Sequence, residues 1–427
     1  MRIDRRQFLK TGGAGALAAG LFSAKDLQAD TSSGFKVVPG ESDAALFARA
    51  RDRFLFPSDV TYCNTGTLGA CPADVMNVYV DGLQSLEEEL PDWPYFQADG
   101  EPLTGYQRLE DVRRRVGAFV NADFSEIAIT QNATMGMSFI ANGMELQPGD
   151  EVITTDQEHS GGVGSWRLRA ARDGIVVKEL PLDSALDDGP DAVVELYEDA
   201  ITAKTKVLMC SHITSLFGIV MPAQELCALA KRYGIMSVVD GAQAIGQIPV
   251  DVKALGCDAF VASPHKWVMA PKGTGFMYLR NDLPQRIWST LAGGHFDDWE
   301  SGAFRFMQFG TGSVPIVQGM VAAFNFVDEI GVERISAWDF ALNRRLREGL
   351  ESIPGVFISS PTQPEFAAGI TSFGVQGVSS RDLQNAFWED KIRVRAQRED
   401  VGVRFCCHLY VNPDDVDRAL SVVERVA

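Results

Sequence analysis

Residues 238–266 read VVDGAQAIGQIPVDVKALGCDAFVASPHK and include two short apolar runs that each end in polar residues. The run at 236–239 leads to Asp240, and the run at 259–262 leads to SPHK, which ends in Lys266. Apolar runs of this length are typical of parallel strands that are buried on both faces of a sheet. Because ligands bind at the carboxyl ends of such strands, we expect Asp240 and Lys266 to lie in one site.

An acid and a lysine at two strand ends are what pyridoxal 5′-phosphate (PLP) requires. The lysine amine forms a Schiff base with the aldehyde, and the carboxylate keeps the pyridine nitrogen protonated, so that the ring accepts electrons. The same pair also occurs by chance in α/β proteins without a cofactor. The surrounding sequence therefore has to decide between the two interpretations.

That surrounding sequence resembles the class V aminotransferase family of fold-type I PLP enzymes, in its isopenicillin N epimerase-like branch. The family signatures DGAQ and SxHK correspond to residues 240–243 and 263–266, and SHITS at 211–215 is closest to that branch. The resemblance runs from about Tyr62 to Asp417. It implies an α/β fold with a large doubly wound, mostly parallel sheet domain and a smaller α+β C-terminal domain. Strands that alternate with helices along the chain favour the same architecture.

The resemblance also implies roles around the cofactor ring. Lys266 is the catalytic residue, which holds PLP and then moves the Cα proton as a general base. Asp240 pairs with the ring nitrogen, and Gln243 binds the ring hydroxyl. His265 orients the phosphate or the lysine, and His159, in DQEHSG, stacks on the ring face.

A strand over 126–130 is followed by QNATMG and then by helical residues. Free N–H groups at a helix start favour a phosphate, although an ordinary N-cap explains Thr134 equally well. In the family this position holds the PLP phosphate, which assigns Ala133, Thr134 and Met135 to it, mainly through the backbone.

Arg404 lies inside the strand pattern VRFCCHLYVN, which resembles the family's C-terminal signature. A buried guanidinium must be paired, and a substrate α-carboxylate supplies a bidentate partner. We therefore predict that Arg404 anchors the substrate. Asn64, in YCNTGTLG, matches a segment that borders the family's active site, although a turn-rich loop needs no function. A nearby set of arginines reads a second acidic group or lies on a solvated edge strand: Arg393, Arg395 and Arg398.

Thr311 lies in RFMQFGT, which resembles a segment that reaches the phosphate of the neighbouring subunit's PLP. The resemblance implies a homodimer with shared active sites. A helix cap is the simpler explanation of a Gly-Thr pair by itself.

The N-terminus differs in composition from the rest of the chain. RRQFLK at 5–10 resembles the twin-arginine motif, and a weakly apolar stretch to about Phe22 follows it. We predict a signal peptide over 1–29 that exports the folded protein to the periplasm, with no membrane attachment after processing. The other predicted parts are an N-terminal segment (30–60) with a helix over 43–56, a large PLP-binding domain (61–300) and a small C-terminal domain (301–427).

The formal charge of −18 argues against nucleic acid and anionic membranes as partners. The seven cysteines lack the spacing of a disulfide framework or a zinc site, and we predict no bound metal. A cysteine desulfurase needs a nucleophilic cysteine shortly before Arg404, and residues 396–401, AQREDV, contain none.

These observations predict an exported PLP enzyme that acts at the α-carbon of a small molecule or peptide with a free amine and carboxylate. Export favours tailoring of a secreted metabolite, such as a pyoverdine-type siderophore precursor, by transamination or decarboxylative chemistry. An isopenicillin N epimerase-like epimerase or aminotransferase is the alternative. A cysteine desulfurase and a non-enzymatic binding protein are further alternatives.

Overall fold

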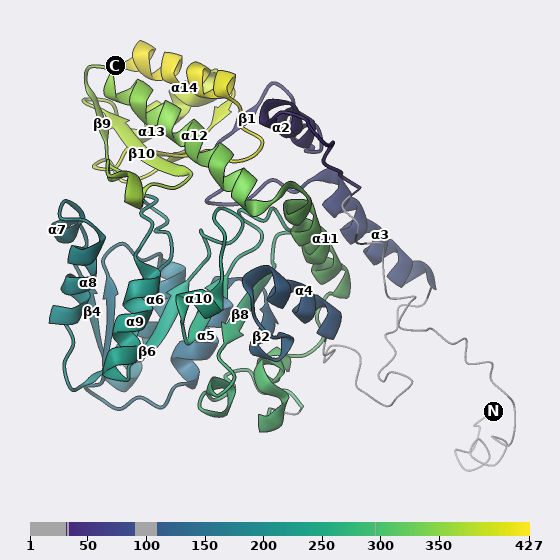
Figure 1. Ribbon diagram of the computed structural model, residues 1–427, viewed down its shortest axis with the longest axis vertical. Helices are drawn as coiled ribbons and strands as arrows, with labels where there is room; N and C mark the ends of the chain where they lie inside the picture. Colours follow the sequence, from purple (N-terminus) through teal and green to yellow (C-terminus); the bar gives the residue numbers. More distant parts are fainter. Residues whose placement is uncertain (1–30, 32–33, 90–108, 295) are drawn as a thin grey trace, which may run out of the picture.

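The computed structural model describes residues 31, 34–89, 109–294 and 296–427 and contains two main sheets (Figure 1). The larger sheet has seven strands in the order β2-β8-β7-β6-β5-β3-β4, and only β8 runs antiparallel to its neighbours. Its strands are β2 (Ile127–Thr130), β3 (Glu151–Thr155), β4 (Val176–Leu180), β5 (Thr205–Ser211), β6 (Met236–Asp240), β7 (Ala259–Ala262) and β8 (Gly275–Leu279). The predicted doubly wound α/β fold is confirmed.

Two groups of helices pack on this sheet, α5 with α6 and α9 with α8 and α10. Their bounds are α5 (Ala133–Gly143), α6 (Ser160–Asp173), α8 (Pro190–Asp199), α9 (Ala223–Tyr233) and α10 (Val252–Leu255), and the short α7 (Asp183–Leu186) precedes α8. Every residue of β7 and β8 is buried. This double coverage explains why the central strands read as unbroken apolar runs in the sequence.

The smaller sheet is antiparallel, with the order β12-β13-β10-β9. It consists of β9 (Val356–Ile358), β10 (Ile370–Val375), β12 (Arg395–Ala396) and β13 (Val403–Cys406). It is accompanied by α12 (Val332–Glu351), α13 (Ser380–Glu389) and α14 (Pro413–Val426). β12 and β13 form a hairpin that brings Arg404 to the interface with the larger sheet.

The N-terminal segment and the short strand after it contact the smaller part of the molecule. β1 (Thr61–Tyr62) pairs in parallel with β11 (Ile392–Arg393), and α2 (Asp43–Arg51) packs on α12 through stacked rings of Phe47 and Trp338, 4.7 Å apart. The helix predicted over 43–56 was too long, because α2 ends at Arg51. Phe54 instead forms a backbone bridge to Pro72 and packs its ring on Tyr410, which an uninterrupted helix does not allow.

The division at residue 301 stays a prediction. All strands of the larger sheet precede this residue, and those of the smaller sheet follow it. Helix α11 (Val314–Ile330) also follows it, yet α11 packs chiefly against α3 (Ala73–Glu89) and also against α4 (Glu110–Val120). We therefore propose that the small domain begins near Val332. The predicted signal peptide, 1–29, lies outside the described residues.

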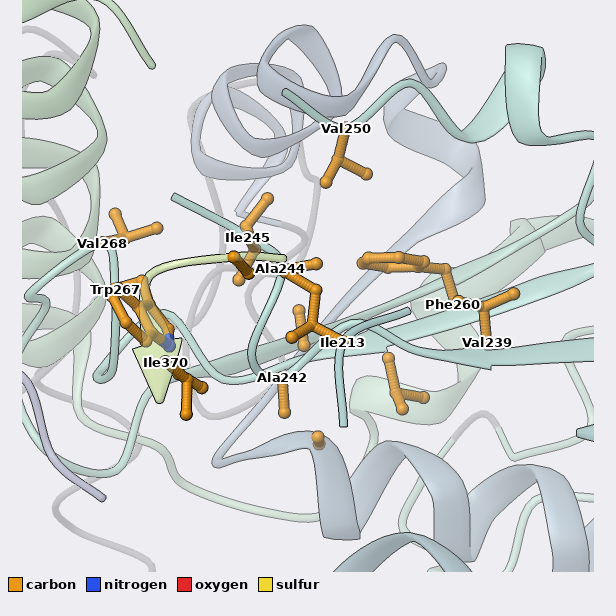
Figure 2. Close-up of a cluster of buried hydrophobic side chains, with 14 of the residues drawn as sticks. Ile213, Val239, Ala242, Ala244, Ile245, Val250, Phe260, Trp267, Val268 and Ile370 are labelled. Atoms are coloured by element: carbon orange, nitrogen blue, oxygen red, sulfur yellow. The ribbon is translucent and has the colours of Figure 1, made fainter. Parts of the chain in front are cut away.

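One hydrophobic core continues from the larger sheet to the smaller one. Figure 2 shows part of it, including Phe260 of β7, Trp267 after β7 and Ile370 of β10. The segment after Lys266 is therefore held between the two sheets. Among the described residues, no helix is both long and apolar enough to cross a membrane.

Candidate active site

The carboxyl ends of the parallel strands gather most of the residues predicted for the site. Asp240 ends β6, and Lys266 follows the end of β7. Ser211, at the end of β5, is the register partner of Asp240, and the next residue, His212, donates its backbone N–H to the Asp240 carbonyl oxygen at 2.8 Å. The register of β6 with β7 pairs Asp240 with Val261, so the segment from the end of β7 to Lys266 begins at the same edge of the sheet as Asp240.

The Asp240 carboxylate is buried and partly engaged by the protein. Its Oδ1 accepts the Ala242 N–H at 2.9 Å, and a Cβ on Gly162 would lie 2.8 Å from Oδ2, so only glycine lets α6 approach this closely. Burial raises the pKa of Asp240, while the charges of Lys266 and His159 oppose that rise. Burial lowers the pKa of Lys266 to about 8, and the charge of Asp240 opposes this change. The two groups are thus close enough to influence each other.

Gly69 fixes the backbone around Lys266, and the sequence reasoning did not single it out. Its N–H donates to the His265 carbonyl at 2.9 Å, and a Cβ on it would lie 1.8 Å from the Lys266 carbonyl oxygen. Its carbonyl accepts the Lys272 amine at 2.7 Å, which commits the other lysine of this region to a structural contact. The only sequence signal for Gly69 was its position at the end of TGTLG, residues 65–69.

The start of α5 leaves fewer free N–H groups than the predicted phosphate site would use. The Ala133 N–H donates to Ser263 Oγ at 3.0 Å, and the Met135 N–H donates to the N-cap Asn132 at 2.9 Å. Among the described residues, the N–H and the hydroxyl of Thr134 have no such partner. A Cβ on Gly161 would lie 2.4 Å from Thr134 Oγ1, so this glycine opens the space that a phosphate oxygen needs.

The hydrogen bonds of His159 and His265 fix the tautomer of each neutral ring. His159 is the N-cap of α6, and its Nδ1 accepts the Gly161 N–H at 3.0 Å, so the proton of the neutral ring lies on Nε2. Partial burial, together with the charge of Lys266, lowers the pKa of His159. His265 Nδ1 contacts the Thr274 carbonyl oxygen at 2.8 Å and must donate to it, which leaves Nε2 as an acceptor.

Gln243 lies in the protein interior and links two segments of the site. Its Nε2 donates to the Gly66 carbonyl at 2.9 Å, and its Oε1 accepts the Trp267 indole N–H at 2.8 Å. The second Nε2 hydrogen is left for the predicted contact with a ring hydroxyl.

Arg404 lies on β13 with 5% of its surface exposed. Nη1 donates to the Ser215 carbonyl at 2.8 Å, and Nη2 donates to Thr67 Oγ1 at 2.7 Å and to Asn64 Oδ1 at 3.4 Å. Its buried Nε has no hydrogen-bond partner in the described part of the chain. The guanidinium is therefore held by neutral acceptors, and its charge is left for an anion. Asn64 contacts Arg404; Thr67 and Ser215 were not predicted, although both lie in motifs quoted above.

Thr311 is exposed in the loop between η3 (Trp299–Met307) and α11. In the described part of the chain, no hydrogen bond joins it to another predicted site residue. It thus stands apart from the cluster around Lys266.

Glu158 is a further residue that the sequence reasoning missed, although it directly precedes His159. Its carboxylate accepts the Ser211 N–H at 3.0 Å and the Ser211 hydroxyl at 2.6 Å. Burial is the main cause that raises its pKa, to about 7; the Ser211 bonds oppose this rise, and the charge of Asp240 adds to it. A carboxyl group that titrates near neutral pH thus lies beside Asp240.

We expect Glu158→Gln to flatten the pH dependence of stability. The pKa of about 7 in the folded protein exceeds the value of about 4.3 in an unfolded chain, so the folded state binds more protons between these values. The free energy of unfolding therefore falls as the pH rises through this window. The partly exposed carboxyl should account for about 1–2 kcal/mol of that fall between pH 5 and pH 8.

Urea unfolding of the holoenzyme at these two pH values measures the effect. Glu424→Gln, on the exposed side of α14, is the matched control and should keep the wild-type dependence. An unchanged dependence in Glu158→Gln would show that Glu158 is already ionised in the folded protein at pH 5.

The residues present fit PLP. An open space beside Thr134 suits the phosphate, Asp240 and Lys266 lie at neighbouring strand ends, and Arg404 has a buried Nε without a partner. A ring held between His159, Asp240 and Lys266 would use these three residues, and Arg404 would be left for a carboxylate of the substrate. When bound, PLP withdraws electrons from the α-carbon of an amine substrate.

Two known families match parts of this chain. Residues 103–418 match the aminotransferase class-V family, and residues 2–22 match the twin-arginine translocation pathway signal sequence. The chain is 28% identical over 411 residues to isopenicillin N epimerase of Amycolatopsis lactamdurans, which covers 90% of this chain and 99% of that protein. It is 29% identical over 340 residues to a probable cysteine desulfurase of Mycolicibacterium paratuberculosis, covering 74% of this chain and about half, 49%, of that protein.

Among solved structures, the fold is similar to that of a C-DES mutant with glycine covalently linked to its PLP cofactor. The TM-score is 0.78 at 26% sequence identity, over 88% of this chain and 98% of that chain. The family match covers most of the chain and includes both sheets. The chain therefore belongs to the aminotransferase class-V family and is a PLP-dependent enzyme that carries a twin-arginine signal sequence.

Proposed function

We propose that the enzyme acts at the α-carbon of an amine that also carries a carboxylate. The observation that carries this proposal is Arg404, a buried guanidinium whose protein acceptors are all neutral. A substrate carboxylate is the counter-ion that such a group lacks. The family alone leaves the substrate open, because the same fold serves many reactions.

The proposal gives each site residue a role toward the cofactor or the substrate. Lys266 holds the cofactor aldehyde and then transfers the proton of the substrate α-carbon, and its pKa of about 8 leaves a useful fraction of neutral amine near neutral pH. Asp240 holds the proton on the ring nitrogen. Thr134 would bind the phosphate, and His159 would pack against the ring.

The hairpin before Arg404 is an argument against desulfuration. The connection between β12 and β13 is short and closed by a bond from the Gln397 N–H to the Gly402 carbonyl at 2.8 Å, and it contains no cysteine. Cys406 is fully buried on β13, so it lacks the mobility of a nucleophile that must reach a substrate sulfur. We therefore favour transamination or decarboxylative chemistry over desulfuration. Epimerisation is the second candidate, supported by the near full-length similarity to isopenicillin N epimerase.

We further propose that the enzyme works in the periplasm on a secreted metabolite or peptide, such as a pyoverdine-type siderophore precursor. The twin-arginine signal supports this proposal, because that route exports folded proteins that already contain their cofactor. Central amino-acid metabolism has its substrates in the cytoplasm.

A homodimer is also part of the proposal. Thr311 is exposed beside a groove of about 370 Å³, whose lining includes Thr130, Gln131, Phe309 and Ile316. Thr130 and Gln131 lead directly into the phosphate-binding start of α5. A second subunit seated here would bring the exposed loop of one chain close to the phosphate site of the other.

We expect replacement of Arg5-Arg6 by two lysines to reduce the periplasmic fraction of the enzyme at least about tenfold, because the twin-arginine route reads this pair. Arg2→Lys, outside the pair, is the control and should be exported normally. Cells with the double-lysine variant should then secrete the unmodified substrate. Mass spectrometry of the medium, before and after addition of purified holoenzyme, detects that compound and its product.

The mass change separates the candidate reactions. Decarboxylation removes carbon dioxide, transamination replaces the amine by a carbonyl oxygen, and epimerisation leaves the mass unchanged but introduces deuterium at the α-carbon in D2O. Normal export of the double-lysine variant, or a medium that the holoenzyme leaves unchanged even in D2O, would contradict the proposal.

A further inference from the structure

Two arginines face each other across the hairpin that carries the substrate anchor. In the antiparallel pairing of β12 with β13, Arg395 is the register partner of Arg404. Residues directly opposite in such a pair point to the same face of the sheet, and like charges at these positions repel each other. The repulsion between Arg395 and Arg404 suggests that Arg395 has a function at this position.

Both guanidinium groups converge on one hydroxyl. Arg404 Nη2 donates to Thr67 Oγ1 at 2.7 Å, and Arg395 Nη1 donates to the same oxygen at 3.3 Å. The Thr67 hydroxyl in turn donates to Asn64 Oδ1 at 2.8 Å. The two nitrogens are therefore no further apart than the sum of the first two distances, and only a neutral group lies between them.

Arg395 differs from the neighbouring arginines in the partner of its guanidinium group. Arg398 forms an ion pair with Asp400 at 3.1 Å, and Arg393 lies over the Trp388 ring. Within the described ranges, Arg395 has no carboxylate partner. An edge strand accounts for exposed charges in general, but it does not account for one that turns toward the anchor.

The charge of Arg395 also reaches the cofactor side of the site. Together with Lys266 and Arg404, it lowers the pKa of His159, after the larger effect of burial. Asp240 is the carboxylate that opposes these three cations at His159. Arg395 is therefore close enough to the site for its charge to act on a group bound there.

We propose that Arg395 binds a second carboxylate of the substrate while Arg404 binds the first, so that the enzyme acts on an amine with two carboxylates. This inference rests on the proposed role of Arg404 at the α-carboxylate. An amino dicarboxylate, free or at the end of a peptide, is the class of substrate that matches the pair of guanidinium groups.

Glutamate and glutamine test the proposal, because they have nearly the same shape and differ in the charge of the side chain. Each is titrated into the holoenzyme while the visible absorbance of the cofactor is followed. We expect the wild type to bind glutamate about tenfold more tightly, and Arg395→Gln to reduce this preference below about threefold. Arg398→Gln is the matched control and should keep the preference, which should weaken in 0.5 M salt.

Equal binding of the two amino acids by the wild type would overturn the inference. An Arg395→Gln variant that binds both more weakly by the same factor would overturn it as well, because Arg395 would then serve the first carboxylate. If neither amino acid changed the cofactor absorbance, the proposed function at the α-carbon would fail. Calorimetric titration with glutarate and its monoamide, which have no amine, would then still decide whether Arg395 recognises a second carboxylate.

Discussion

Lys266→Ala is expected to yield a folded protein without a covalently held cofactor and with turnover reduced at least about a thousandfold. Both effects follow from the loss of one amine, which holds the aldehyde and also moves the α-carbon proton. The fold should survive, since the segment is held by backbone contacts such as the one between the Gly69 N–H and the His265 carbonyl. Removal of an amine whose pKa is lowered by burial also removes an unfavourable desolvation.

Borohydride reduction followed by peptide mapping measures the attachment. Lys272→Ala is the control, because the Lys272 amine is bound to the Gly69 carbonyl and should not hold the cofactor. This variant should keep the absorbance of the attached cofactor, although its stability should fall. A label on Lys272 in the wild type would transfer the role to that residue.

Arg404→Met is expected to lower kcat/KM by about 30- to 1000-fold, which corresponds to about 2–4 kcal/mol of lost substrate binding. The loss arises because methionine fills the same space without a fork of donors for a carboxylate. The cofactor absorbance should persist, since its proposed contacts come from other segments. The free energy of unfolding should change by less than about 2 kcal/mol, because the lost bonds are to neutral acceptors and a buried charge disappears with them.

Arg404→Lys separates charge from geometry. It keeps the cation but loses the planar fork, and it should recover only part of the activity. Steady-state kinetics with the substrate, together with cofactor absorbance, makes the comparison. If Arg404→Met instead unfolded the protein, or released cofactor with unchanged turnover per remaining cofactor, Arg404 would be structural. The anchor would then have to be Arg393, Arg395 or Arg398.

The sequence predicted the larger sheet well because its central strands are buried on both faces. Such strands read as apolar runs, and the residue that follows each run marks the edge where ligands bind. The predicted helix over 43–56 was too long, because contacts of Phe54 with distant residues override the local pattern. The pairing of β1 with β11 was not predictable, since two-residue strands have no periodicity to detect.

In the site, too, local sequence patterns were predictable and contacts between distant segments were not. Asp240, Lys266 and Arg404 stood out because a charged residue at the end of, or within, an apolar run needs an explanation. Thr67 and Ser215 did not stand out, because their contacts with Arg404 join segments far apart in the chain. Gly69 and Glu158 lay inside quoted motifs, yet their importance rests on a close approach and on burial, which sequence spacing does not show.

The long-range contact between Asn64 and Arg404 has a consequence for the order of events during synthesis. The two residues are separated by 340 positions, so at about 5–20 residues per second the ribosome needs roughly 20–70 s between them. The signal sequence leaves the ribosome first, so it is exposed throughout that interval. An export route that began during translation would keep the two halves of the binding site on opposite sides of the membrane until translation ends. The twin-arginine route exports folded proteins. It therefore allows β13 to complete the site in the cytoplasm, where the cofactor is available.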